Sequence, residues 1–332
     1  MQSKNEWTMK TKRVIITGAT GFVGANLARR LLRDGHELHL LVRKNYTAWR
    51  IETIRSNVKI HEIDLLDADK LNTVVKQVQP DWIFHLAAYG AYESQTNIHK
   101  MIQTNLIGTI NLVEACLKTG FEAFVNTGSS SEYGCKDHAP SEKEWLEPNS
   151  HYAVTKASAT LFCRFLALSR HVRLVTLRPY SVYGPFEEPT RLIPTLIIHG
   201  LRGDFPTLVN ANVARDFVYV EDVNDAYLLA ASGIEQEIGP VYNIGTGRQT
   251  SIMEVVETVR RKMKITAEPL WGSMQDRNWD TAVWVADNKT AQEFLDWKPR
   301  YDFDHGFEET INWFIAQPEM IQFYQRHREL PA

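Results

Sequence analysis

A glycine-rich turn between a short apolar run and an amphipathic helix constrains this chain more than any other feature. The β-branched run Val14-Ile15-Ile16 leads into Thr17-Gly18-Ala19-Thr20-Gly21-Phe22-Val23-Gly24, and residues 25–32 then show helical periodicity. Glycines at this spacing permit a tight turn, a close approach of backbone N–H groups to an anion, and close packing of the helix on the strand. The pattern predicts the opening βαβ unit of a dinucleotide-binding fold.

The composition sets the broad class of protein. The 332 residues are 44% hydrophobic and 23% charged, which is enough to bury a large core in one domain or in two unequal ones. The net charge of −3 argues against nucleic acid or an anionic membrane as a partner. With no apolar run that could span a bilayer and no signal sequence in the polar residues 1–12, we expect a cytoplasmic protein. Cys116, Cys135 and Cys163 lack C-x-x-C spacing, which indicates reduced thiols rather than disulfides or a metal site.

Strand-like and helix-like segments alternate along the first half of the chain. Strands are predicted at 13–17, 37–42, 58–61, 81–85, 122–127 and 172–177, and helices at 22–34, 67–78, 97–119 and 151–170. This order is typical of an α/β fold, here a Rossmann-type doubly wound parallel sheet. Val241–Gly247 reads as a further strand that returns to the sheet. Ligands of such sheets bind beyond the carboxyl ends of the strands.

We assign the chain to two domains on this basis. Residues 12–178 and 217–247 form the expected NAD(P)-binding Rossmann domain. Residues 179–216 and 248–332 form a smaller mixed α/β C-terminal domain, which we expect to bind the substrate.

The ends of the second and third predicted strands carry candidate cofactor-binding residues. Arg43-Lys44 stands where an acidic residue usually meets a ribose without a 2′-phosphate, and Arg50 follows a turn later. A guanidinium can bind a 2′-phosphate through two hydrogen bonds, so this pair favours NADP over NAD. Asp64-Leu65 is placed to meet an adenine ring, although Asp64 also suits a helix cap because a helix begins near Asp67.

The fourth predicted strand ends in His85-Leu86-Ala87-Ala88, whose small residues leave room for a flat ligand. We include Leu86, Ala87 and Ala88 among the cofactor-binding residues. Asn105 lies in the middle of the next predicted helix. Its amide either faces water or makes a buried structural hydrogen bond near the cofactor.

A serine, a tyrosine and a lysine form the candidate catalytic group. Ser129 follows the fifth predicted strand, and Tyr152 and Lys156 are four residues apart on a predicted helix, so they share one face. An ammonium beside a phenol lowers its pKa from the usual value near 10 and allows it to exchange a proton with a substrate hydroxyl. Tyr152 is the only tyrosine with a lysine at this spacing. The alternative is an ordinary surface pair on a helix.

From the glycine loop to Trp297-Lys298-Pro299, the chain resembles the extended short-chain dehydrogenase/reductases that modify nucleotide-linked sugars. The resemblance implies that Ser129, Tyr152 and Lys156 are the catalytic triad. It also implies a homodimer formed through a four-helix bundle by the helices near 97–119 and 151–170. The residues that the resemblance places at the cofactor are Gly18, Gly21, Gly24, Asp64, Leu65, Asn105 and Tyr180.

Arginines in the later half of the chain suit a diphosphate, since their fork of donors matches phosphate oxygens. By the resemblance, Arg215 and Arg277 hold the pyrophosphate of a nucleotide-diphosphate sugar. The residues themselves leave open ion pairs of Arg215 with Asp216 or Asp222, and of Arg277 with Asp280. Ser181 and Arg191 replace two asparagines with which many 4-epimerases of the family hold their substrate. Trp279 is a candidate for stacking on a base or sugar.

Departures from the family pattern narrow the reaction. The family's 4,6-dehydratases carry an Asp-Glu pair where this chain has Ser130 and Ser131, which we include among the substrate-binding residues. Glu132 is one position late, and in an extended segment its side chain would point to the opposite face. A dehydratase is therefore the weaker alternative, because elimination of water needs a separate acid and base.

Two reactions remain for the same triad. Tyr180–Pro185 and Glu187–Arg191 resemble enzymes that reduce CDP-linked 4-keto-6-deoxyhexoses, and Arg43-Lys44 favours NADP. The preferred interpretation is such a reductase, and the next is a nucleotide-sugar 4-epimerase with tightly bound NAD. A non-catalytic NADP sensor is the alternative from another class, and it is disfavoured because sensors of this fold lose the tyrosine or the lysine.

Overall fold

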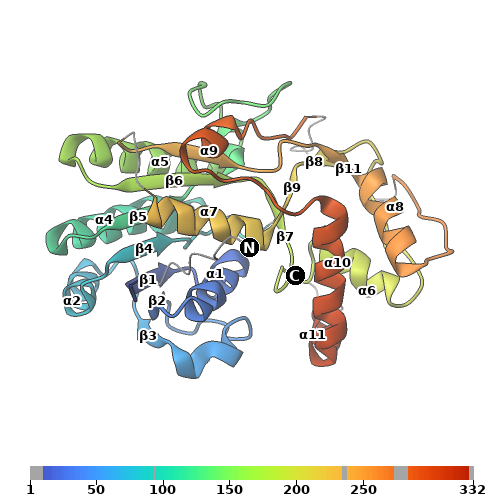
Figure 1. Cartoon of the computed structure of the whole chain (residues 1–332), viewed down its shortest axis with the longest axis horizontal. Coiled ribbons are helices and arrows are strands. Elements are labelled where there is room, and N and C mark those ends of the chain that lie inside the picture. Colours follow the sequence, from blue (N-terminus) through green and yellow to red (C-terminus); the bar gives the residue numbers. More distant parts are fainter. Residues whose placement is uncertain (1–9, 93, 234–237, 273–282, 329–332) are drawn as a thin grey trace, which may run out of the picture.

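The computed structural model describes residues 10–92, 94–233, 238–272 and 283–328. A seven-stranded sheet forms its larger part, in the order β10-β6-β5-β4-β1-β2-β3 (Figure 1), and all neighbouring strands pair in parallel. Its strands are β1 (Arg13–Thr17), β2 (Glu37–Val42), β3 (Lys59–Glu62), β4 (Trp82–His85), β5 (Ala123–Thr127), β6 (Leu174–Pro179) and β10 (Val241–Ile244). The predicted Rossmann-type α/β fold is confirmed.

Helices cover both faces of this sheet because its strands are apolar on both sides. Val14 and Ile16 of β1 pack into one core with Leu27, whereas Ile15 faces a second core with Leu71 and Leu112. On the first face lie α1 (Phe22–Arg33), α7 (Val220–Ser232) and α9 (Lys289–Phe294), and on the second α2 (Ala68–Val78), α4 (Gly108–Thr119) and α5 (His151–Arg170).

A smaller group of elements lies beside the sheet (Figure 1) and has its own core, which includes Leu196, Val255 and Phe307. Its helices are α6 (Leu192–Gly200), α8 (Ile252–Met263), α10 (Phe303–Ala316) and α11 (Pro318–Arg328). Two small sheets accompany them, in which β7 (Ser181–Tyr183) pairs with β9 (Phe217–Tyr219) and β8 (Ala214–Arg215) pairs with β11 (Thr250–Ser251). Trp297 packs in the core of the large sheet, although the proposed boundary places it in the smaller domain.

Some helical segments depart from regular α-helical geometry. The helix predicted at 97–119 is divided into α3 (Ile98–Ile102), the π-helical η2 (Gln103–Ile107) and α4. Two 3₁₀ segments, η1 (Glu52–Asn57) and η3 (Ser130–Tyr133), follow β2 and β5. Among the described residues, no helix is both long enough and apolar enough to cross a membrane.

Candidate active site

The glycine turn has the geometry that the sequence predicts. Gly18 has a φ of +71°, and a Cβ there would lie 2.5 Å from the carbonyl carbon of Leu86. A Cβ on Gly24 would clash with the carbonyl oxygen of Gly18, so the helix can approach the strand only without a side chain. Gly21 is the N-cap of α1 and makes no side-chain cap, which leaves the N–H groups of Phe22 and Val23 pointing at this end. This turn fits the pyrophosphate of a dinucleotide.

The basic residues after β2 differ in whether they are exposed or bonded within the chain. Arg43 and Lys44 are exposed directly after the strand, as a contact with a ribose phosphate requires. Arg50, by contrast, is buried, and its guanidinium bonds the carbonyl oxygen of Phe186 (2.8 Å) and a carboxylate oxygen of Glu188 (2.7 Å). Arg50 is therefore engaged in structural hydrogen bonds within the chain.

Asp64 and Leu65 lie at the carboxyl end of β3. Asp67, not Asp64, caps α2 by accepting the N–H of Lys70 at 3.1 Å. Asp64 is exposed and accepts the N–H of Leu66 through one carboxylate oxygen (3.0 Å), which leaves its second oxygen for another donor. Asp64 is therefore not the N-cap of α2. Its role toward an adenosine stays a proposal.

Of the two alternatives for the Asn105 amide, contact with water or buried structural hydrogen bonds, the structure has the second. Its side chain is fully buried in the π-helical segment, accepts the N–H of Tyr89 (2.8 Å) and donates to the carbonyl oxygen of Tyr89 (2.8 Å). It also donates to Thr155 Oγ1 of α5 at 2.9 Å. Asn105 therefore fixes the loop that begins with Leu86-Ala87-Ala88 against the helix that carries Tyr152.

The structure brings Ser129, Tyr152 and Lys156 together. Ser129 follows β5 as the N-cap of η3, and its side chain lies close enough to the Tyr152 phenol to lower the pKa of that phenol. Lys156 lies one turn further along α5, and only 3% of its surface is exposed. A phenol, a hydroxyl and an amine at the carboxyl end of β5 can share one substrate oxygen and its proton.

Burial dominates the acidity of this group. Burial raises the pKa of Tyr152 to about 12, although the nearby Ser129 hydroxyl opposes this shift. Glu132 and Arg191 are the charged groups that act most on the phenol, not Lys156. Burial lowers the pKa of Lys156, and the carboxylate of Glu132 opposes that shift. The expectation that Lys156 lowers the pKa of Tyr152 below its usual value is therefore wrong for the protein alone, because loss of solvation is the larger effect.

Glu132 is committed to the structure rather than to substrate. Segment 130–133 is a 3₁₀ turn, not the extended segment expected from the sequence. The buried carboxylate accepts the backbone N–H of Ser129 (2.8 Å), the hydroxyl of Thr160 (2.9 Å) and Nε of Arg178 (2.8 Å). It thereby holds Ser129 and α5 in place, and no local pattern in the sequence indicates this ion pair with Arg178.

The expected substrate residues near the triad have mixed surroundings. Ser131 Oγ lies 2.7 Å from Ser129 Oγ, while Ser130 is buried beside it. Ser181 donates its backbone N–H to the carbonyl oxygen of Asp216 and is half-buried. Tyr180 is 8% exposed, and its buried hydroxyl has no hydrogen-bond partner among the described residues.

The arginines proposed for the diphosphate differ in their surroundings. Arg191 is exposed, donates to the carbonyl oxygen of Ala91 (2.7 Å) and lies 5.4 Å from the ring of Tyr92. Arg215 lies 5.7 Å from the ring of Trp284. The carboxylate of Asp216 accepts bonds from Thr246, Gly247 and Ala286, and that of Asp222 from Arg300 and Tyr301. Arg277, Trp279 and Asp280 lie outside the described residues.

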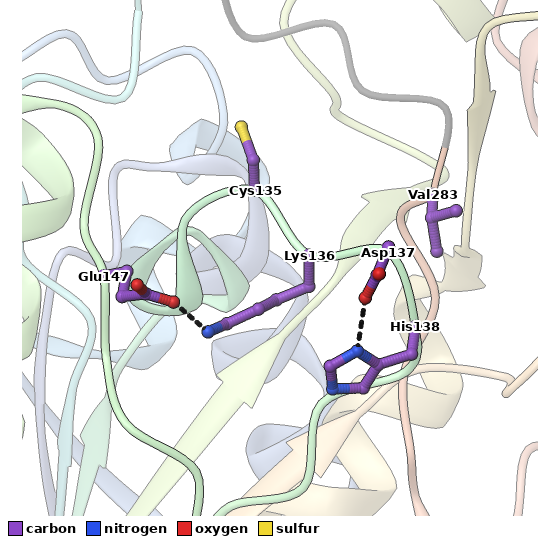
Figure 2. A pocket seen from close by; sticks show the side chains of 6 residues that line it. All are labelled: Cys135, Lys136, Asp137, His138, Glu147 and Val283. Carbon is purple, nitrogen blue, oxygen red and sulfur yellow. Dashed lines mark hydrogen bonds and ion pairs between the residues drawn. The ribbon is translucent and has the colours of Figure 1, made fainter.

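A surface hollow has charged side chains that pair with one another. It lies on the loop after η3, where Lys136 pairs with Glu147 and His138 Nδ1 lies 2.7 Å from Asp137 (Figure 2). Cys135 stands at its rim and, like Cys116 and Cys163, is a free cysteine, as the sequence predicts. The charged side chains of this hollow are therefore satisfied by each other.

His85 at the end of β4 was not anticipated as a site residue. It is 1% exposed, and burial lowers its pKa to about 3, with the charge of Lys156 adding to the shift. Its ring nitrogens lie 2.7 Å from Thr17 Oγ1 and 2.8 Å from Thr109 Oγ1. The strand end His85-Leu86 was noted only for its small neighbours, because no local pattern distinguishes a buried histidine from an exposed one.

A neutral buried His85 makes part of the stability depend on pH. Because the folded pKa lies below the unfolded value near 6.5, the unfolded chain binds the extra proton first, so this contribution is complete above pH 6.5 and is lost as the pH falls toward 3. Relative to His85→Asn, the wild type should lose about 1.4 kcal/mol of stability per pH unit below 6.5. Urea unfolding of both proteins from pH 7.5 to 5 measures the difference, and parallel curves would contradict the prediction.

Comparisons with known proteins agree with this fold. A 4,6-dehydratase/3,5-epimerase/reductase of Arabidopsis thaliana that acts on UDP-linked sugars is 27% identical over 94% of this chain, and the chain spans about half, 48%, of that trifunctional protein. The UDP-glucose 4-epimerase of Thermotoga maritima, solved with UDP-glucose, superposes with a TM-score of 0.83 at 25% identity and covers 92% of this chain and 99% of its own. MoeE5, in complex with UDP-glucose and NAD, is 31% identical with a TM-score of 0.78 and the same two coverages.

The parallel sheet, the glycine turn and the Ser–Tyr–Lys cluster define a Rossmann-type α/β protein with an oxidoreductase-like site. A sequence model described as the NAD dependent epimerase/dehydratase family matches residues 14–245, and the chain belongs to this family.

Proposed function

We propose that this protein is an NAD(P)-dependent oxidoreductase that transfers a hydride at a carbon of a nucleotide-diphosphate sugar. The observation that carries the proposal is the group of half-buried Ser129 and Tyr152 with buried Lys156 after β5, on the same edge of the parallel sheet as the glycine turn after β1. A bound nicotinamide would supply or accept the hydride. The chain itself would bind the dinucleotide at the N-terminus of α1 and place the sugar oxygen between Ser129 and Tyr152.

The protonation of Tyr152 favours reduction of a keto sugar. With a pKa of about 12 the phenol carries its proton at neutral pH, and this is the form that donates to a keto oxygen as its carbon gains a hydride. The Ser129 hydroxyl would fix that oxygen by a second hydrogen bond. Lys156 would return a proton toward the phenolate and stabilise its charge.

Our preferred substrate is a CDP-linked 4-keto-6-deoxyhexose, with NADPH as the reductant. Arg43 and Lys44 support NADP because both are exposed at the end of β2, where a 2′-phosphate would lie. The sequence similarity of Tyr180–Pro185 and Glu187–Arg191 to reductases of such sugars supports the substrate class.

A nucleotide-sugar 4-epimerase with tightly bound NAD is the second candidate. MoeE5 binds UDP-glucose and NAD, and the Thermotoga maritima protein is a UDP-glucose 4-epimerase. Dehydration is less favoured by the geometry, since Ser130 and Ser131 cannot serve as the acid and base and Glu132 is bonded to Arg178.

The copurifying cofactor and the products distinguish these reactions. Mass spectrometry of the denatured protein identifies any nucleotide, and incubation with CDP-, UDP-, dTDP- and GDP-linked 4-keto-6-deoxyhexoses and NADPH tests reduction. The reductase is expected to purify without nucleotide, to oxidise NADPH and to form the 4-hydroxy sugar. Tightly held NAD with interconversion of 4-epimers would establish the epimerase instead, and loss of water from the hexose would establish a dehydratase.

We also propose that two chains associate through α3 and α5. Val154, Leu161, Phe165 and Leu168 form an exposed apolar face along α5, with 47%, 59%, 63% and 50% of their surfaces exposed. Ile98 and Ile102 of the adjacent α3 extend it. A second copy of the chain would cover this face and complete the four-helix bundle that the resemblance implies.

Charge placed in this face tests the dimer. Leu161→Glu with Phe165→Glu is expected to reduce the mass measured by light scattering from two chains to one, because the carboxylates would be buried unpaired. Met253→Glu, an equally conspicuous change at a residue 47% exposed on α8, should leave the mass unchanged. A wild-type mass of one chain would refute the proposal.

A further inference from the structure

A continuous line of buried hydrogen bonds connects the loop after β4 with the backbone of Tyr152. It joins groups on β1, β4, η2, α4 and α5. On the side of the β4 loop, the N–H of Ala87 bonds Thr17 Oγ1 (3.2 Å), which in turn bonds His85 Nδ1 (2.7 Å). On the other side of the ring, His85 Nε2 bonds Thr109 Oγ1 (2.8 Å), and Thr109 Oγ1 bonds the carbonyl of Asn105 (2.7 Å). Asn105 Nδ2 then bonds Thr155 Oγ1 (2.9 Å), which bonds the carbonyl of Tyr152 (2.8 Å).

The donors along this line fix the protonation of His85. The hydroxyl proton of Thr109 is donated to the carbonyl of Asn105, so Thr109 Oγ1 can only accept from His85 Nε2. His85 Nδ1 is then a lone-pair acceptor for the hydroxyl proton of Thr17, whose oxygen accepts the N–H of Ala87. Every bond points the same way, from Ala87 to Tyr152, and only the neutral Nε2–H tautomer satisfies them all.

The two ends of the line are the two halves of the candidate site. Its beginning is in the segment Leu86–Ala88, which also touches the glycine turn, since the Gly18 position lies against Leu86. Its end holds the peptide group of Tyr152, and the charge of Lys156 acts on His85 from one side. Thr17, His85, Thr109 and Thr155 are all at most 4% exposed, so no water competes for these bonds.

We propose that His85, as its neutral Nε2–H tautomer, is a positioning residue that fixes the segment Leu86–Ala88 and Tyr152 relative to each other. It acts through Thr17 on one side and through Thr109 and Asn105 on the other, and it touches neither substrate nor cofactor. The proposal rests on the proposed function for its meaning in catalysis. Its structural content, the tautomer and the direction of the bonds, does not depend on any activity.

Isosteric changes at Thr17 and Thr109 test this positioning role. Thr17→Val and Thr109→Val each remove a hydroxyl without changing side-chain volume much, while Thr17→Ser and Thr109→Ser keep the hydroxyl. Each valine variant is expected to lower kcat roughly tenfold to hundredfold and to raise the KM for the nicotinamide cofactor, with the KM for the sugar unchanged. The serine variants should restore most of both constants. Thr310→Val, which removes a buried hydroxyl bonded to Gly306 in α10, is the matched control and should leave kcat and both KM values unchanged.

The double variant separates positioning from a general loss of packing. Because both threonines act through His85, Thr17→Val with Thr109→Val should lower kcat little more than the stronger single change. Effects that multiply, or valine variants that lower Tm while keeping kcat and the cofactor KM, would overturn the proposal.

Nitrogen NMR of His85, assigned by comparison with His85→Gln, provides a measurement that needs no turnover. The expected result is a neutral ring protonated on Nε2 throughout pH 5–8. A ring protonated on Nδ1, or one that titrates near 6.5, would refute the proposal even if the protein proves to be an oxidoreductase. If no nucleotide sugar is turned over, NAD and NADP affinities from calorimetry replace the kinetic constants, so a wrong proposed function is told apart from a wrong role for His85.

Discussion

Tyr152→Phe is expected to lower turnover roughly 10²–10⁴-fold and to leave the fold and dinucleotide binding intact. The change removes one oxygen from a half-buried ring that stays in the same place, so the substrate oxygen loses its proton donor while Ser129 and Lys156 remain. Initial rates of NAD(P)H oxidation with the substrate found in the screen measure kcat. Calorimetric titration with the dinucleotide measures binding.

Tyr183→Phe is the matched control for this experiment. Tyr183 is buried, and its hydroxyl donates to the carbonyl oxygen of Phe303 at 3.4 Å in the core of the smaller group of helices. It should retain turnover within a small factor. A Tyr152→Phe protein as active as the wild type would exclude the phenol as the acid. If neither the wild type nor Tyr152→Phe turns over any substrate, the non-catalytic sensor is favoured.

Much of the fold could be predicted from local pattern, for a physical reason. The central strands are buried on both faces and therefore appear as unbroken apolar runs, as in Val14-Ile15-Ile16. The bounds of β1 and β2 agree with the prediction. The π-helical turn at Gln103–Ile107 was not predictable, because one extra residue per turn does not interrupt the apolar periodicity on either side.

The candidate site shows where local pattern stops being informative. The glycine turn and Ser129 follow from motifs at strand ends, and Tyr152 and Lys156 follow from their four-residue spacing on helix α5. Long-range partners do not, and Arg50 bonds Glu188 across 138 positions of the chain. The pKa of Tyr152 likewise depends on how much solvent the folded chain removes, which no spacing encodes.

Glu132 is the group whose loss should cost the most stability. Its fully buried carboxylate holds the guanidinium of Arg178, which is itself 3% exposed, and anchors Ser129 and Thr160. In Glu132→Gln the amide would turn a donor toward Nε of Arg178 and leave that charge uncompensated. Removing one partner of a buried ion pair costs about 3–5 kcal/mol, whereas replacing both partners costs much less. Glu132→Gln should therefore unfold at markedly lower urea concentration, and Glu132→Gln with Arg178→Leu should recover part of the loss.

The same substitution should change the pH dependence of catalysis. The charge of Glu132 favours the ammonium form of Lys156 and disfavours the phenolate of Tyr152, so its removal lowers both pKa values. Reduction needs both groups protonated, and the alkaline limb of the kcat profile should therefore move to lower pH in the single and the double variant. Glu308→Gln, which breaks the exposed pair with Lys262, is the matched control and should change neither the urea midpoint nor the profile. A Glu132→Gln protein as stable as Glu308→Gln, with an unshifted alkaline limb, would show that this carboxylate neither supports the fold nor tunes the triad.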